Sequence, residues 1–234
     1  MIQRIWSVDF LRGIAMLMMV WFHFLFDLNY LGFVQISLYS GFWGIFQKAT
    51  ISLFLLLVGI GITISRKNRA DFEIHIIKRA SFLILVALAI SGVTYLLFPE
   101  YWIYFGIIHM IAVSLLLSIP FSGKKITALV SGLAIISIPY IANIESFGIQ
   151  IFYWLGFSAA QQSFDFVPMF PWFGLVLTGI FIGNTFIAQF KSLDKFSFTK
   201  NRLLNFLGKN SLAIYLLHQP IIFGSLVAIN YFIL

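Results

Sequence analysis

Seven long apolar stretches, joined by short polar segments, limit the possible folds of this chain more than any other feature of its sequence. The stretches lie near residues 8–29, 44–65, 79–98, 102–121, 125–144, 166–190 and 210–233. A helix needs about 20 consecutive, mostly apolar residues to cross the hydrocarbon core of a bilayer, where backbone polar groups must find partners inside the protein. The pattern therefore predicts an all-α fold, a polytopic transmembrane helical bundle of about seven spans.

The composition agrees with a membrane protein and excludes several kinds of chemistry. Of the 234 residues, 61% are hydrophobic and 10% are charged, whereas a soluble domain has about 25% charged residues. The absence of Cys excludes disulfides, thiol catalysis and thiolate metal sites. No repeat or soluble linker is visible, so residues 1–234 are expected to form a single transmembrane domain. Segment 147–157 is too short to span and suits an interfacial helix or a re-entrant turn.

The distribution of Lys and Arg predicts which side of the membrane each end faces. Three connecting segments are basic, namely 66–79, 124–125 and 191–209. The positive-inside rule places all three in the cytoplasm. We therefore expect a multi-pass protein of the cell (cytoplasmic) membrane with its N-terminus inside and its C-terminus outside. The net charge of +7 reflects this bias, and nucleic acid is not expected as a partner.

Ionisable residues inside membrane spans are costly and mark function by default. The first stretch holds Asp9, Arg12, His23 and Asp27, which fall within one stripe of about 120° on a helix. Asp27 lies four residues after His23, a spacing that lets a carboxylate hold an imidazole. The alternative is structural: Asp9 and Arg12 form an ion pair at the helix end, while His23 bonds to a neighbouring helix.

Two further histidines and two aromatic residues are candidates for a substrate site. His109 in FGIIHMIA is expected about 10 Å into the fourth stretch, and His218 in the last stretch shares a helical face with Tyr215. Each histidine alone is also typical of packing, and Trp172 is as typical of an interfacial anchor. Without HExxH or a carboxylate cluster, the four His predict no metal site.

The polar stripe suits chemistry that crosses the bilayer. Arg12 near the cytoplasmic end can contact the phosphates of a donor, and His23 in the outer half can take a proton from an acceptor hydroxyl or amine as the acyl carbon is attacked. Asp27 is predicted to orient the imidazole. Further cations border the predicted inner mouth and can strengthen the field there: Arg66, Lys67, Arg79 and Lys209.

These residues resemble a known family. SVDFLRGIA followed by WFHFLFDL is similar to the first helix of the heparan-α-glucosaminide N-acetyltransferase catalytic-domain family of membrane proteins. The spacing of Arg12 and His23 is also similar to that in the first helix of the acyltransferase-3 family. FGIIHMIA, FPWFG and LGKNSLAIYLLHQP resemble later segments of bacterial members of the first family, so the likeness reaches from residue 7 to about 220.

The resemblance implies transfer of an acyl group, usually acetyl from acetyl-CoA, to a sugar or glycan across the membrane. It implies Arg12, with Asp9 in the same motif, as the contact on the CoA side and His23 as the catalytic residue. The eukaryotic enzyme has Asn in place of His23 and a catalytic His in the first outer loop, which has no His here. Heparan is therefore not the expected acceptor. The expected partners are membrane lipids, a CoA thioester and the glycan, and homodimerisation stays open.

A second function class is a transporter or permease of a small polar or anionic solute that uses the same stripe as its pathway. Such folds usually show inverted repeats and paired broken helices, and neither is visible here. A retinal-binding receptor needs an intramembrane Lys, whereas every Lys here lies in a connecting segment or at the edge of a stretch.

Overall fold

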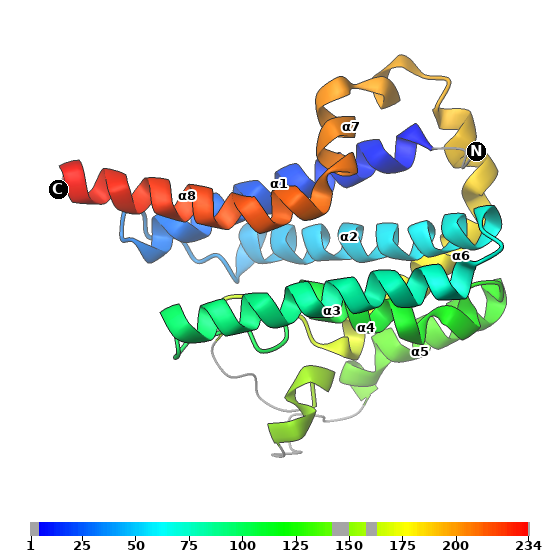
Figure 1. Cartoon of the computed structure of the whole chain (residues 1–234), viewed down its shortest axis with the longest axis horizontal. Coiled ribbons are helices and arrows are strands. Elements are labelled where there is room, and N and C mark those ends of the chain that lie inside the picture. Colours follow the sequence, from blue (N-terminus) through cyan, green and yellow to red (C-terminus); the bar gives the residue numbers. More distant parts are fainter. Residues whose placement is uncertain (1–4, 142–149, 158–162, 234) are drawn as a thin grey trace. The chain divides into compact units, whose positions relative to one another are not determined.

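A computed structural model describes residues 5–141, 150–157 and 163–233 of the chain, and these residues form helices and connecting segments without strands (Figure 1). The order is α1 (Trp6–Tyr30), α2 (Gly41–Asn68), α3 (Phe72–Leu97), α4 (Ile107–Leu117), η1 (Ile119–Phe121), α5 (Lys125–Ile141), η2 (Gln150–Leu155), α6 (Met169–Leu193), η3 (Ser197–Lys200), α7 (Arg202–Lys209) and α8 (Ser211–Ile233).

Five of these helices are long and apolar enough to cross a membrane: α1, α2, α3, α6 and α8. The prediction of an all-α, polytopic membrane protein is therefore confirmed. The two other predicted spans are shorter in the structure, with 11 residues in α4 and 17 in α5. Segment 147–157 contains the 3-10 helix η2, while residues 147–149 and the end of the predicted fifth stretch lie outside the described part of the chain.

Two helical segments differ from the sequence-based expectation. Helix α3 begins at Phe72, so Lys78 and Arg79 lie on a helix and not in a loop. No Gly or Pro lies between Phe72 and Arg79, and Glu73 in the first turn suits the positive end of the helix dipole. Helix α7 forms within the basic segment that was expected to be a loop, and Asn201 caps it by accepting a hydrogen bond from Leu204 N at 3.0 Å.

The chain divides into two compact units, residues 1–54 with 188–234 and residues 55–187. In the first unit, α1 packs against α7 and α8. The contact with α7 is so close that a Cβ at Gly13 would overlap the backbone of Leu204, and one at Gly208 would overlap the Asp9 carbonyl. Glycine is thus required at both positions for α7 to lie against the start of α1.

In the second unit, small residues bring helices into backbone contact. A Cβ at Gly59 of α2 would overlap the backbone of α6 at Val176, and one at Gly179 would overlap Leu56. A Cβ at Gly183 would crowd Thr63, so the spacing of Gly179 and Gly183 lets α6 pack closely on α2. Helix α6 has non-helical backbone at Phe170, directly before Pro171.

Candidate active site

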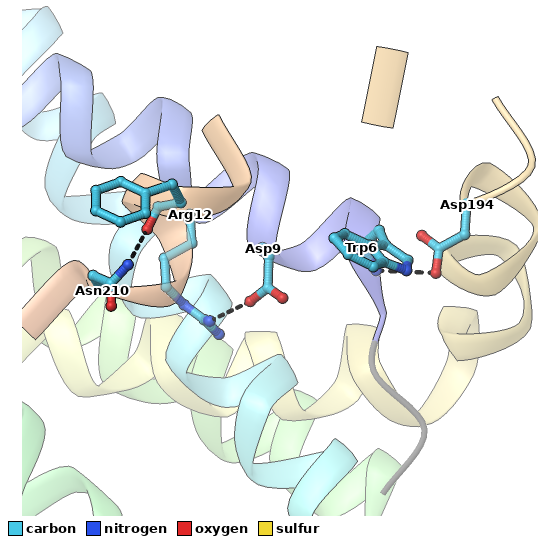
Figure 2. A network of polar contacts seen from close by, with 6 residues as sticks. Trp6, Asp9, Arg12, Asp194 and Asn210 are labelled. Atoms are coloured by element: carbon cyan, nitrogen blue, oxygen red, sulfur yellow. Dashed lines mark hydrogen bonds and ion pairs between the residues drawn. The ribbon is translucent and has the colours of Figure 1, made fainter. Parts of the chain in front are cut away.

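Asp9 and Arg12 form an ion pair in the first turns of α1. Arg12 Nη1 donates to Asp9 Oδ1 at 2.9 Å, and both side chains are largely covered (Figure 2). The ion pair that the sequence analysis gave as the structural alternative is therefore present in the structure. It also orients the guanidinium, which suits a residue that must meet an anion with defined geometry. An ion-pair role and a ligand-binding role are therefore compatible here.

The start of α1 is held by Asp194, a residue that the sequence did not single out. Trp6 N donates to Asp194 Oδ2 at 3.0 Å (Figure 2). Ser7 N donates to Asp194 Oδ1 at 2.7 Å. The Ser7 hydroxyl donates to Phe190 O at 2.8 Å. Since Ile5 at the N-cap provides no side-chain bond, the carboxylate supplies the missing acceptor and complements the helix dipole. It fixes the end of α1 that carries Asp9 and Arg12.

His23 lies half-buried in the middle of α1, with its ring oriented by its own helix. Its Nδ1 is 3.0 Å from Met19 O. A carbonyl oxygen only accepts hydrogen bonds, so Nδ1 carries the hydrogen, and in the neutral ring Nε2 carries the lone pair. The ring lies 4.9 Å from that of His218, centroid to centroid, in an edge-to-face arrangement. Two of the predicted site histidines are thus brought together.

His218 has the same arrangement on α8. Its Nδ1–H donates to Tyr215 O at 2.6 Å, and its ring lies 5.7 Å from the Tyr215 ring. Nε2 is therefore the basic nitrogen of the neutral ring here as well. The residue is buried. The three predicted site residues His23, Tyr215 and His218 form one cluster between α1 and α8.

Asp27 does not hold His23, and that prediction is wrong. Asp27 is 1% exposed, and its Oδ1 accepts a hydrogen bond from Gln219 Nε2 at 2.6 Å. The reason is local: the Met19 carbonyl already takes the Nδ1–H of His23, while α8 brings an amide to the carboxylate. Among the described residues, the other oxygens of the pair, Asp27 Oδ2 and Gln219 Oε1, are buried and accept no hydrogen bond.

His109 lies in the first turn of α4, because that helix begins at Ile107 and not near residue 102. Gly106 N donates to its Nδ1 at 3.2 Å, and its Nε2 lies 3.1 Å from Ser91 Oγ. Because the Ser91 hydroxyl donates to Ile103 O at 2.6 Å, Ser91 Oγ accepts from Nε2–H. Both ring nitrogens are engaged, as in the packing alternative.

The other predicted site residues are distributed over both units. In the second unit, Arg66 lies 3.7 Å from Glu73 and 5.2 Å above the Phe72 ring; Lys67 and Arg79 are exposed, and Trp172 is half-buried near the start of α6. In the first unit, Lys209 ends α7 directly after Gly208, which touches Asp9. Lys209 is thus on the helix that packs beside the Asp9–Arg12 pair.

Fold and site together define a helical membrane protein with an ion pair on α1 and a histidine cluster between α1 and α8. No group of three or more His, Cys, Asp or Glu suited to a metal occurs in the described residues. The sequence profile of the catalytic region of heparan-alpha-glucosaminide N-acetyltransferase matches residues 4–220. The chain belongs to this family, which implies an acetyltransferase. Searches of curated proteins and of solved structures found no match.

Proposed function

We propose that this chain is a membrane acyltransferase that moves an acyl group, typically acetyl, from cytoplasmic acyl-CoA to a hydroxyl or amine of a sugar or glycan on the outer side. Family membership supports the reaction class. The observation that carries the assignment of the site is the His23 ring, whose Nδ1–H is fixed on Met19 O so that Nε2 is the basic atom.

His23 acts as the general base in this proposal. Its Nε2 takes the proton of the acceptor O–H or N–H while that oxygen or nitrogen attacks the thioester carbon; the C–S bond then breaks, and CoA leaves as a thiolate that is protonated. Such a base contributes about 10²–10⁴-fold to the rate. His218 beside it and Tyr215 complete the wall of the acceptor site.

Asp27 acts as a positioning residue in this proposal. Its carboxylate bonds to Gln219 and therefore does not orient the His23 ring directly. Gln219, however, directly follows His218 in the sequence. The Asp27–Gln219 bond therefore fixes the turn of α8 that presents His218 to His23. This role replaces the direct carboxylate–imidazole contact as the reason why an acidic residue lies so deep in the span.

The donor end of the site is assigned to the cationic end of α1. Arg12, oriented by Asp9, contacts the phosphates of acyl-CoA, and Lys209 on the adjoining α7 adds positive field. Arg12 and His23 are eleven residues apart, or roughly 16 Å along the helix, so the donor must reach His23 with an extended arm.

The topology that fits this reaction has seven spans in one domain of the cell membrane, with the N-terminus inside and the C-terminus outside. The short α4 is compatible with it because the non-helical residues before it are paired inside the protein: Phe164 N donates to Tyr101 O at 3.0 Å and Val167 N to Phe105 O at 3.1 Å. Non-helical backbone is tolerated at membrane depth when protein buries it.

The test is release of CoA by the purified chain in lipid nanodiscs. The chain has no Cys, so a thiol reagent detects only the CoA that is set free. Acetyl-CoA with a panel of glycoside acceptors should release CoA only when an acceptor is present, and His23→Ala should lower the rate by about 100-fold or more. Normal turnover by His23→Ala would refute the base, and solute uptake by proteoliposomes without CoA release would favour a transporter.

A further inference from the structure

The segment between α6 and α8 combines exposed aromatic and cationic side chains on a rigid frame. Its apolar members Phe196, Phe198, Leu203 and Phe206 are between 54% and 61% exposed. Its cations Lys195, Lys200 and Arg202 are exposed as well, and none of the three has an ion pair in the described part of the chain. We call these seven residues the basic aromatic platform.

Hydrogen bonds from buried side chains fix the backbone of the platform. The buried amide of Asn205 donates to Thr199 O at 2.7 Å and to Asn201 O at 2.8 Å. The hydroxyl of Thr199 donates to Phe196 O at 2.8 Å. The inward side of α7 is fixed by the contact of Gly208 with the Asp9 carbonyl. The exposed side chains therefore project from a frame that is anchored to α1.

Helix α7 has two distinct sides. At 100° per residue, Arg202, Leu203, Phe206 and Lys209 fall within about 120° of one another, and all four are exposed. The opposite side holds Asn205 and Gly208, which are buried. Within the first unit, α7 lies crosswise to α1 and α8 (Figure 1). A short helix across the axis of spanning helices, with apolar and cationic residues outward, is typical of the membrane–water interface.

The charge of the segment is complementary to an anionic surface. Residues 191–209 contain five Lys or Arg and one acid, Asp194. Both oxygens of that carboxylate accept backbone N–H groups at the start of α1. The segment joins α6 to α8, two helices long enough to cross the membrane, so the surface nearest to it is the headgroup layer of the leaflet where these helices end.

We propose that the basic aromatic platform binds anionic lipid headgroups of this leaflet, with its aromatic residues seated at the level of the glycerol and headgroup region. The cations contact lipid phosphates, and the aromatic rings fill the apolar boundary beneath them. Because α7 touches α1 beside Arg12, the bound lipid layer also supports the cationic end of α1. This inference does not depend on the reaction that the chain catalyses.

The first experiment measures depth. Leu203→Cys gives a single labelling site in a chain without Cys. A nitroxide is attached there, and the protein is placed in nanodiscs of phosphatidylcholine with phosphatidylglycerol. The accessibility of the nitroxide to oxygen and to a water-soluble nickel chelate should be intermediate between the values for acyl chains and for water. Leu217→Cys, on the exposed side of α8, is the matched label within a span and should be accessible to oxygen alone. A label at residue 203 as open to the nickel chelate as one in free solution would overturn the proposal.

The second experiment measures lipid preference. Native mass spectrometry should find phosphatidylglycerol retained over phosphatidylcholine by the wild type. Lys195→Gln/Lys200→Gln/Arg202→Gln should lower that preference on the order of 10-fold to 100-fold, since each cation near an anionic surface contributes separately. The control Lys48→Gln/Lys124→Gln/Lys125→Gln removes the same charge elsewhere and should keep it. An unchanged preference in the first variant, or a raised KM for acyl-CoA as its sole effect, would overturn the proposal.

Discussion

The bond between Asp27 and Gln219 joins the two helices of the histidine cluster, and its energy can be measured. Gln219→Leu leaves a deeply buried carboxyl without its donor, which should lower the free energy of unfolding by about 1–3 kcal/mol. Asp27→Leu/Gln219→Leu removes both polar groups and should recover much of that loss. Reversible unfolding in mixed micelles of the wild type, Gln219→Leu, Asp27→Leu and the double variant completes a double-mutant cycle. Additive losses in the double variant would contradict the pairing.

The two histidine environments predict different consequences for the same kind of substitution. His109→Gln breaks the bonds to Gly106 and Ser91 and should lower thermal stability, while turnover per folded molecule stays within about threefold of wild type because no proton transfer depends on it. His23→Gln should lose turnover by about 100-fold at near-normal stability. Thermal unfolding and CoA release, measured on both variants, separate the roles. A loss of turnover with His109→Gln equal to that of His23→Gln would make His109 part of the reaction.

At the scale of elements, the start of α1 depends on a carboxylate from a distant part of the chain. Asp194→Ala removes the acceptor of Trp6 N and Ser7 N and should cost about 1 kcal/mol, as loss of an N-cap does. The effect should be local: hydrogen exchange of the first turn of α1 should quicken while the middle of the helix is unchanged. Asp194→Asn keeps an acceptor and should show a smaller effect. Equal exchange in all three proteins would show that the cap is dispensable.

The close contact between α1 and α7 predicts a second effect at this scale. Gly208→Ala places a methyl group against the Asp9 carbonyl and should destabilise the protein by about 1–3 kcal/mol through overpacking. Gly92→Ala is the matched control, because nothing lies within 4 Å of the added methyl group there; alanine should be neutral or stabilising at this helical position. Thermal unfolding of both variants is the measurement. An equal response would mean that α7 does not touch α1.

The sequence predicts the long helices well because apolar length is a local property, and α1, α2, α6 and α8 lie close to their predicted ranges. It misses α7, whose eight residues are too few to stand out in a search for spans. It misses Asp194 because the bond to Ser7 joins residues 187 positions apart. The spacing of His23 and Asp27 allows a contact between them. Spacing alone does not show that His23 bonds to the Met19 carbonyl instead and that Asp27 bonds to Gln219. The proximity of His23 and His218 requires the packing of α8 on α1.

At the scale of the whole molecule, the number of spans depends on α4 and α5. Helix α4 has 11 residues and a length of roughly 16 Å, against a hydrocarbon core of about 30 Å. If α4 and α5 enter the membrane only partway and return to the same side, the chain has five spans. The orientation of α6 and α8 and the sides of both termini are then the same as with seven spans. Tests on the termini therefore cannot distinguish five spans from seven. Only the connection between η1 and α5 changes sides.

Lys124 lies in this connection, and the chain without Cys makes the test direct. With seven spans, Lys124→Cys is cytoplasmic and should resist a membrane-impermeant maleimide in intact cells but react after permeabilisation. Glu100→Cys should react in intact cells, and Lys67→Cys should not, whichever number is right. Reaction of Lys124→Cys from outside, with the two controls as stated, would establish five spans. The basic pair Lys124–Lys125 favours the cytoplasmic side, because moving two cations across the bilayer during insertion is costly.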